Sequence, residues 1–225
     1  MFLQAQSINS LPTEKKMISL WEIFFSGGIL GNAVIVTILI MGIIMLYIYF
    51  ERSFLIKRES KEDADFLETI KDCIHEGRIE AALDLCESTD SPESRVIKKG
   101  LQRIGRPIAD ISGAMQNQGQ TEVALLEQNL SILSSISGAA PMLGFLGTVI
   151  GMLLSFLKMS ATSGVLSPKL LTEGLYTALS ATIAGLIIGI IAYILYNVLV
   201  TRISQFIVKL QTQSNDFLDA LNKPL

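Results

Sequence analysis

Two long apolar runs separated by a short polar loop dominate the C-terminal half of the chain. No charged side chain lies between Glu127 and Lys158, and none lies between Glu173 and Arg202. Each run exceeds the roughly 20 residues that a helix needs to cross a hydrocarbon layer of about 30 Å. A third apolar run occupies residues 29–50. The pattern predicts an all-α membrane protein with three transmembrane helices, at 29–50, 128–158 and 174–201.

The segments outside these three runs are more polar. Residues 1–28 are interpreted as an N-terminal amphipathic segment at the membrane surface, anchored by Trp21, or else as an extension of the first span. Residues 51–127 form a predicted helical loop, and residues 159–173 form a short loop on the opposite side. In residues 202–225 the apolar positions recur at helical spacing, which predicts that the third span continues as a long helical extension.

Within the large loop, prolines and polar turns predict where several helices begin. Pro92 follows a polar turn and fits the first turn of a helix, as does Pro107. From Pro107 the apolar pattern runs into the second span, which predicts one helix that reaches Lys158. An uninterrupted helix of that length has about 50 residues and measures roughly 75 Å, so it projects well beyond the bilayer. Gly113 and Gly119 are the two positions at which we expect an interruption.

The distribution of basic residues predicts the orientation in the membrane. With the N-terminus outside, every arginine of the chain lies inside, and Lys15 and Lys16 oppose this arrangement. The inner flanks of the spans then hold Arg52, Lys57, Arg58, Lys61, Arg202 and Lys209. The positive-inside rule therefore favours an N-out, C-in topology with residues 51–127 in the cytoplasm.

Composition excludes several function classes. Half of the residues are hydrophobic and 17% are charged, against about 25% charged in a soluble domain. The net charge of −3 does not favour nucleic acid as a partner. Cys73 and Cys86 are predicted to be free thiols, and with His75 as the single histidine we expect no metal site and no cofactor. No nucleophile and base occur in a catalytic pattern, so we do not expect an enzyme.

Small residues punctuate the second and third runs at helical spacing. Water exclusion does not drive helices together in lipid, so small residues that let backbones approach closely become the packing device. We assign helix packing, with a kink at the proline, to Pro141, Gly144, Gly147, Gly151, Gly185 and Gly189. These spans are therefore built to pack against other helices.

Hydroxyl groups are the polar chemistry that these spans offer. We assign the pore lining and proton pathway to Thr148, Thr182, Ser155 and Thr177. In the functional interpretation, Thr148 and Thr182 line a cavity and form hydrogen bonds with water or with a partner's carboxylate. In the structural interpretation, each threonine hydroxyl donates to the carbonyl one turn back on its own helix and only helps packing.

Two segments carry a family resemblance. GAAPMLGFLGTVIGM followed by TEGLYTALSATIAGLIIGIIAYILYN resembles the MotA/TolQ/ExbB proton channel family, and the three-span layout resembles its ExbB/TolQ branch. The resemblance implies a homo-oligomer, a pentamer, in the bacterial inner membrane around the helices of an ExbD/TolR-type single-span partner with a membrane Asp. It also implies that proton passage performs work on a TonB- or TolA-type protein, with membrane lipids around the assembly.

The match is residue by residue in the motifs. Thr148 and Thr182 match the family's pore threonines. Packing positions of the family are matched by Pro141, Gly144, Gly147 and Gly185. Many members of the family have a proline where this chain has Ile191. Many also have a glutamate where it has Thr177, and the absence of that glutamate leaves the partner's carboxylate as the titrating group. A TolQ-like or gliding-motor subunit and a non-conducting scaffold remain alternatives, whereas a small-molecule transporter is disfavoured because no inverted repeat is evident.

Overall fold

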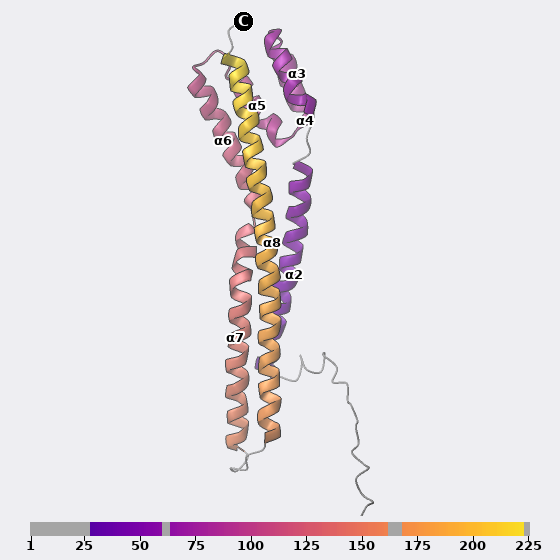
Figure 1. The fold of residues 1–225 in the computed structure, drawn as a ribbon, viewed down its shortest axis with the longest axis vertical. Helices are drawn as coiled ribbons and strands as arrows, with labels where there is room; N and C mark the ends of the chain where they lie inside the picture. The colour runs from indigo at the N-terminus through magenta and orange to yellow at the C-terminus, as the bar shows by residue number, and fades with distance from the viewer. Residues whose placement is uncertain (1–27, 60–63, 162–167, 223–225) are drawn as a thin grey trace, which may run out of the picture. The chain divides into compact units, whose positions relative to one another are not determined.

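The computed structural model describes residues 28–59, 64–161 and 168–222, and the regular structure in these ranges is α-helical throughout (Figure 1). The helices are α2 (Gly28–Glu59), α3 (Ala64–His75), α4 (Ile79–Thr89), α5 (Pro92–Leu101), α6 (Ile108–Glu127), α7 (Leu130–Ala161) and α8 (Pro168–Asn222). The predicted all-α class is confirmed. The amphipathic segment predicted at 1–28 lies outside the described residues, except for its last position.

Three stretches in the described ranges are long and apolar enough to cross a membrane. They lie in Gly31–Glu59, Ile108–Ala161 and Gly174–Asn222, which agrees with the predicted number of spans. Helix also covers both ends of the loop expected at 159–173, since α7 continues to Ala161 and α8 begins at Pro168. The N-out, C-in orientation stays a prediction.

The helix predicted from Pro107 to Lys158 is divided, but not at either of the two glycines where an interruption was expected. Gly113 and Gly119 both lie inside α6, so neither interrupts it. The break comes at Gln128, with φ −52° and ψ 137°, and at Asn129, with φ 64°. Asparagine enters the left-handed region more readily than most residues, so it can occupy this position where a β-branched side chain could not.

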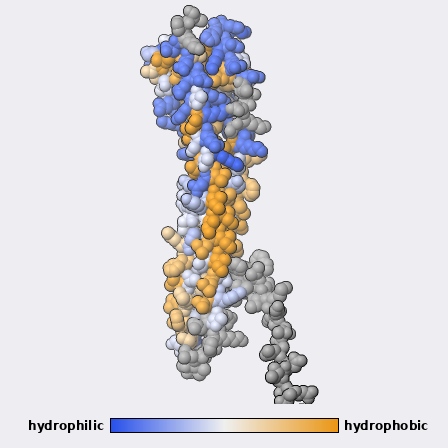
Figure 2. All heavy atoms as spheres, in the orientation of Figure 1, coloured by the Kyte–Doolittle hydropathy of each residue, from blue (hydrophilic) through white to orange (hydrophobic). Residues whose placement is uncertain are grey.

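Two compact units make up the chain. The hairpin unit contains the described residues of 1–36 and 143–184, so it includes the C-terminal part of α7 and the first part of α8. The core unit contains the described residues of 37–142 and 185–225. Hydrophilic residues gather over α3 to α6 in the core unit (Figure 2).

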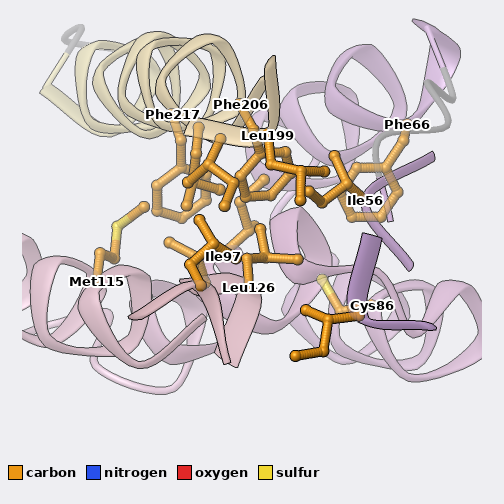
Figure 3. Close-up of a cluster of buried hydrophobic side chains, with 14 of the residues drawn as sticks. Ile56, Phe66, Cys86, Ile97, Met115, Leu126, Leu199, Phe206 and Phe217 are labelled. Atoms are coloured by element: carbon orange, nitrogen blue, oxygen red, sulfur yellow. The ribbon is translucent and has the colours of Figure 1, made fainter. Parts of the chain in front are cut away.

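The core unit surrounds a cluster of large apolar side chains from several helices (Figure 3). Phe217 of α8 is fully buried and packs beside Met115 of α6, close to Gly100 of α5. A Cβ on Gly100 would lie 2.7 Å from both Met115 Sδ and Phe217 Cε1, so a glycine is required there. Apolar positions at spacings of three, four and seven residues place Ile203, Phe206 and Leu210 on the same buried stripe of α8.

Buried carboxylates tie the helices of the core unit together. Glu122 of α6 accepts hydrogen bonds from Arg95 Nε at 2.9 Å and Arg95 Nη2 at 2.8 Å. The bond to Glu122 raises the pKa of Arg95 above its ordinary value. Glu93 of α5 pairs with Lys209 of α8 at 2.9 Å and accepts a bond from Gln213 at 3.0 Å. These pairs fix α5 against both α6 and α8.

Candidate functional site

Within the hairpin unit, α7 and α8 touch through their smallest residues. A Cβ built on Gly147 would lie 2.7 Å from Ala181 Cβ, and one built on Gly151 would lie 2.7 Å from Ala178 Cβ. Real Cβ atoms do not approach this closely, so both positions of α7 require glycine. The spacing of four residues puts Gly147 and Gly151 on one face, which is the small-residue packing expected of helices in lipid.

Ser155 lies inside the same contact. Its hydroxyl donates to the Gly151 carbonyl at 2.8 Å, and its side chain is buried against Gly174 of α8. A Cβ on Gly174 would overlap Ser155 Oγ, so this glycine is required as well. In the single chain, the Ser155 hydroxyl is satisfied within its own helix and its side chain packs against Gly174; the pore-lining role predicted for it stays a prediction.

Thr148 and Thr182 face each other across the α7–α8 contact. Thr182 Oγ1 donates to the Gly144 carbonyl on the other helix at 2.9 Å, and it lies 3.4 Å from Thr148 Oγ1. Thr148 Oγ1 donates to the Phe145 carbonyl of its own helix at 2.5 Å. Thr148 thus bonds one turn back as the structural interpretation expects, but Thr182 bonds to a neighbouring helix. Both side chains are half-buried.

This geometry determines which hydrogen-bonding groups the threonine pair offers to water or to another molecule. Each hydroxyl has one proton, and both protons are used on carbonyls, so the pair shows lone pairs that accept hydrogen bonds from water or from a protonated carboxyl. The carbonyls of Gly144 and Phe145 lie inside α7, where each can also accept the helical N–H four residues on. Either hydroxyl can therefore turn towards an anion without leaving a carbonyl unpaired.

Pro141 and Gly189 form a corresponding contact in the core unit. A Cβ on Gly189 would lie 2.5 Å from Pro141 Cγ and 3.1 Å from the Ser137 carbonyl oxygen. Pro141 has no N–H, so the Ser137 carbonyl lacks its helical donor, and the bare backbone of Gly189 packs over that position. The sequence predicted both residues as packing positions, and the structure brings them together.

The remaining predicted residues are only partly described. Gly144 and Gly185 are buried, and Gly144 also provides the carbonyl that Thr182 binds. The side chain of Thr177 lies outside the described part of the structure. Sequence reasoning missed the role of Gly174, although its position in TEGLYT, four residues before Ala178, was a usable signal.

The site contains hydroxyls and carbonyls but no acid or base of its own, because both apolar runs are free of charged residues. Among the residues that the structure describes, no group of three or more His, Cys, Asp or Glu side chains could hold a metal ion. The groups that the site offers are therefore hydrogen-bond donors and acceptors.

Comparison with known proteins gives one family and several relatives. The sequence model of the MotA/TolQ/ExbB proton channel family matches residues 88–212, just over half of the chain. A protein of Methanothermobacter thermautotrophicus, named as a biopolymer transport protein ExbB homolog, is 29% identical over 191 residues, which cover 84% of this chain and 66% of that protein. The biopolymer transport protein ExbB of Aquifex aeolicus is 40% identical over 80 residues, covering 36% of this chain and 53% of that protein.

The matched segments leave part of each relative uncovered. The chain spans about two thirds of the Methanothermobacter protein and about half of the Aquifex protein. The biopolymer transport protein ExbB of Helicobacter pylori, 40% identical over 77 residues, is likewise covered for 52% of its length, and the match takes in 34% of this chain. Both threonines, the glycines of α7 and the core of α6 fall inside the family match.

Proposed function

The chain belongs to the MotA/TolQ/ExbB proton channel family, and we propose that it is the ExbB-like subunit of a proton-driven motor in the bacterial inner membrane. In this proposal five copies of the chain surround the single-span helices of an ExbD/TolR-type partner. The partner's membrane Asp carries the proton, and the resulting movement performs work on a TonB-type protein for outer-membrane transport. The relatives named as biopolymer transport proteins ExbB support this assignment.

The threonine pair is the observation that carries the proposal. Thr148 and Thr182 bring two half-buried hydroxyls within 3.4 Å of each other in apolar runs that have no charged side chain. An ionised side chain without polar neighbours in lipid costs roughly 3 kcal/mol or more, so an ionised partner Asp needs hydrogen-bonding groups beside it. The pair can provide it in both protonation states, because its hydroxyls accept from the acid and, after turning, donate to the carboxylate.

The mechanism follows from this difference between the two protonation states. The partner Asp is neutral when protonated from outside, and it can then leave the threonines and face the apolar surface of the subunit. When it releases its proton towards the cytoplasm, the carboxylate is held beside Thr148 and Thr182. Each protonation change therefore biases which subunit the partner faces, and repeated changes move it around the ring.

Proton flux into liposomes that hold the chain together with its partner tests the proposal. Replacing both threonines, Thr148→Val and Thr182→Val, keeps shape but removes the hydroxyls. If they offset roughly 3 kcal/mol of charge burial, flux falls about a hundredfold. Ser180→Ala is the matched control, because the Ser180 hydroxyl donates to the Tyr176 carbonyl of its own helix at 2.9 Å. Undiminished flux in the correctly assembled double variant would refute the role of the pair.

One observation favours a second candidate, a scaffold that stabilises its partner without conducting. Both threonine hydroxyls are already satisfied by carbonyls, as a purely structural contact would have them. The scaffold predicts assembly with the partner but no proton flux in the unmodified complex. It also predicts that replacing the partner's Asp by Asn changes nothing, whereas the motor predicts that this replacement stops flux.

A further inference from the structure

A buried arginine from another helix is hydrogen-bonded to the joint between α6 and α7, a contact we call the clasp. Arg52 of α2 has a side chain that is 5% exposed, and its Nη1 donates to the Leu125 carbonyl of α6 at 3.1 Å. Its Nη2 lies 3.5 Å from Gln128 Oε1 at the break itself. The guanidinium therefore sits at the C-terminal end of α6, where the helix dipole favours a cation.

Arg52 takes the place of a missing helical bond. In a continuous helix the Leu125 carbonyl would accept the N–H of Asn129, four residues on. With Asn129 at φ 64° the chain leaves the helix there, and α7 restarts with Ile132 N–H donating to the Asn129 carbonyl at 3.2 Å. The break takes this helical donor away from the Leu125 carbonyl, and the bond from the buried Arg52 guanidinium replaces it, so Arg52 stabilises the broken form directly.

The local sequence favours the opposite arrangement. The segment Leu125-Leu126-Glu127-Gln128-Asn129-Leu130 contains neither glycine nor proline, and most of its residues are good helix formers. Local preference for a continuous helix thus competes with a tertiary contact that breaks it. A second acceptor for Arg52 is present as well, because Glu51 Oε1 lies 3.3 Å from its Nη2.

We propose that the α6–α7 joint has two states and that Arg52 selects between them. In the open state, which the structure shows, Arg52 holds the Leu125 carbonyl and Asn129 is left-handed. In the closed state Arg52 releases the Leu125 carbonyl and keeps its bond to Glu51, Asn129 becomes helical and its N–H donates to the Leu125 carbonyl, so that α6 continues into α7. A displacement of α2 at Arg52 is then converted into a change in how α6 joins the start of α7.

Amide hydrogen exchange in the full chain tests the joint without reference to proton conduction, so its outcome is separable from that of the proposed function. In the unmodified protein we expect the amides of 128–130 to exchange faster than those inside α6. Arg52→Met removes the clasp and should slow this exchange on the order of tenfold, because the joint closes. Arg58→Met, at an exposed position on the same helix, should leave exchange unchanged.

Two substitutions at Asn129 test the same joint with Arg52 in place. Asn129→Ala makes the left-handed conformation cost about 1–2 kcal/mol, so exchange at 128–130 should slow on the order of tenfold. Asn129→Gly favours the open state and should keep exchange fast, also when combined with Arg52→Met. Equal exchange in the alanine and glycine variants, or faster exchange in Arg52→Met than in the unmodified chain, would overturn the two-state joint.

Discussion

The hairpin unit and the core unit pack their helices by different means. In the hairpin unit the contact is made by glycine, alanine and hydroxyl residues, and it brings backbone against backbone. In the core unit, large apolar side chains such as Phe217 and Leu199 form a buried cluster from several helices, and the carboxylates of Glu93 and Glu122 are buried in the same unit. Helix α8 therefore changes its packing chemistry along its length, from small residues in the hairpin unit to the large apolar cluster of the core unit.

The difference corresponds to the medium that each packing suits. Burying large apolar side chains is favourable when the alternative is water, at roughly 25 cal/mol per Å². In a bilayer the alternative is lipid, so close van der Waals contact and interhelical hydrogen bonds have to hold helices together. The glycine contacts of α7 and the Thr182 bond to Gly144 are of this second kind.

The largest expected effect comes from removing a side chain of the core unit. Phe217→Ala should lower the free energy of unfolding by about 3–5 kcal/mol, because the ring is fully buried and leaves a cavity. Leu153→Ala in the hairpin unit should cost less than about 0.5 kcal/mol, since Leu153 is 57% exposed in the single chain. Denaturant unfolding of the detergent-solubilised chain measures both, and equal losses would break the comparison.

The buried ion pair of the core unit comes next. Glu122→Gln should lower the free energy of unfolding by about 2–3 kcal/mol, because two charge-assisted bonds from Arg95 are weakened. Glu127→Gln lies on the same helix at an exposed position and serves as the control. An equally large loss of unfolding free energy in Glu127→Gln would show that the negative charge of α6, and not the Arg95–Glu122 pair, contributes this stability.

Adding one methyl group tests the backbone contact of the hairpin unit. Gly151→Ala should destabilise the chain by about 2 kcal/mol, because the new Cβ overlaps Ala178 and the helices must move apart. Gly138→Ala places its Cβ where nothing lies within 4 Å, and it should be neutral or slightly stabilising. Thermal unfolding followed by circular dichroism distinguishes them, and a harmless Gly151→Ala would disprove the close contact.

The smallest effect concerns a thiol in the core unit. Burial raises the pKa of Cys86 from 9.0 to about 11, against the opposing charge of Lys98. Because the unfolded thiol ionises first, stability is full below pH 9 and falls as the pH rises from 9 towards 11. At pH 10 the loss should be about 1.4 kcal/mol relative to Cys86→Ala. Parallel stability–pH curves of the two proteins would contradict a buried thiol.

The sequence predicts the contacts of the hairpin unit well where one residue type serves a geometric need. Glycines at intervals of three and four residues indicate a face for close packing, and Gly147 and Gly151 both lie in such a contact. The proline and the glycine that meet in the core unit, Pro141 and Gly189, were likewise recognisable. Their pairing across helices requires only two antiparallel neighbours, which the short loop between the two spans already indicates.

What the sequence could not predict depends on tertiary contacts. The sequence around Asn129 predicts a continuous helix, whereas in the structure the helix is broken there and Arg52 of α2 donates to the Leu125 carbonyl beside the break. From the sequence, Arg52 is only one of the basic residues that flank the spans and predict the orientation in the membrane. The partner of a hydroxyl is equally hidden, since Thr148 and Thr182 are alike in sequence but differ in the helix to which they donate.

The bond from Thr182 to the Gly144 carbonyl has a mechanical consequence. It is a link between α7 and α8 made by the same proton that an approaching anion would claim. An acceptor that took this proton in a hydrogen bond would at the same time remove the bond from Thr182 to α7, so binding at this hydroxyl would be coupled to the contact between the two helices. The backbone contacts at Gly147 and Gly151 would remain and limit any separation of α7 and α8.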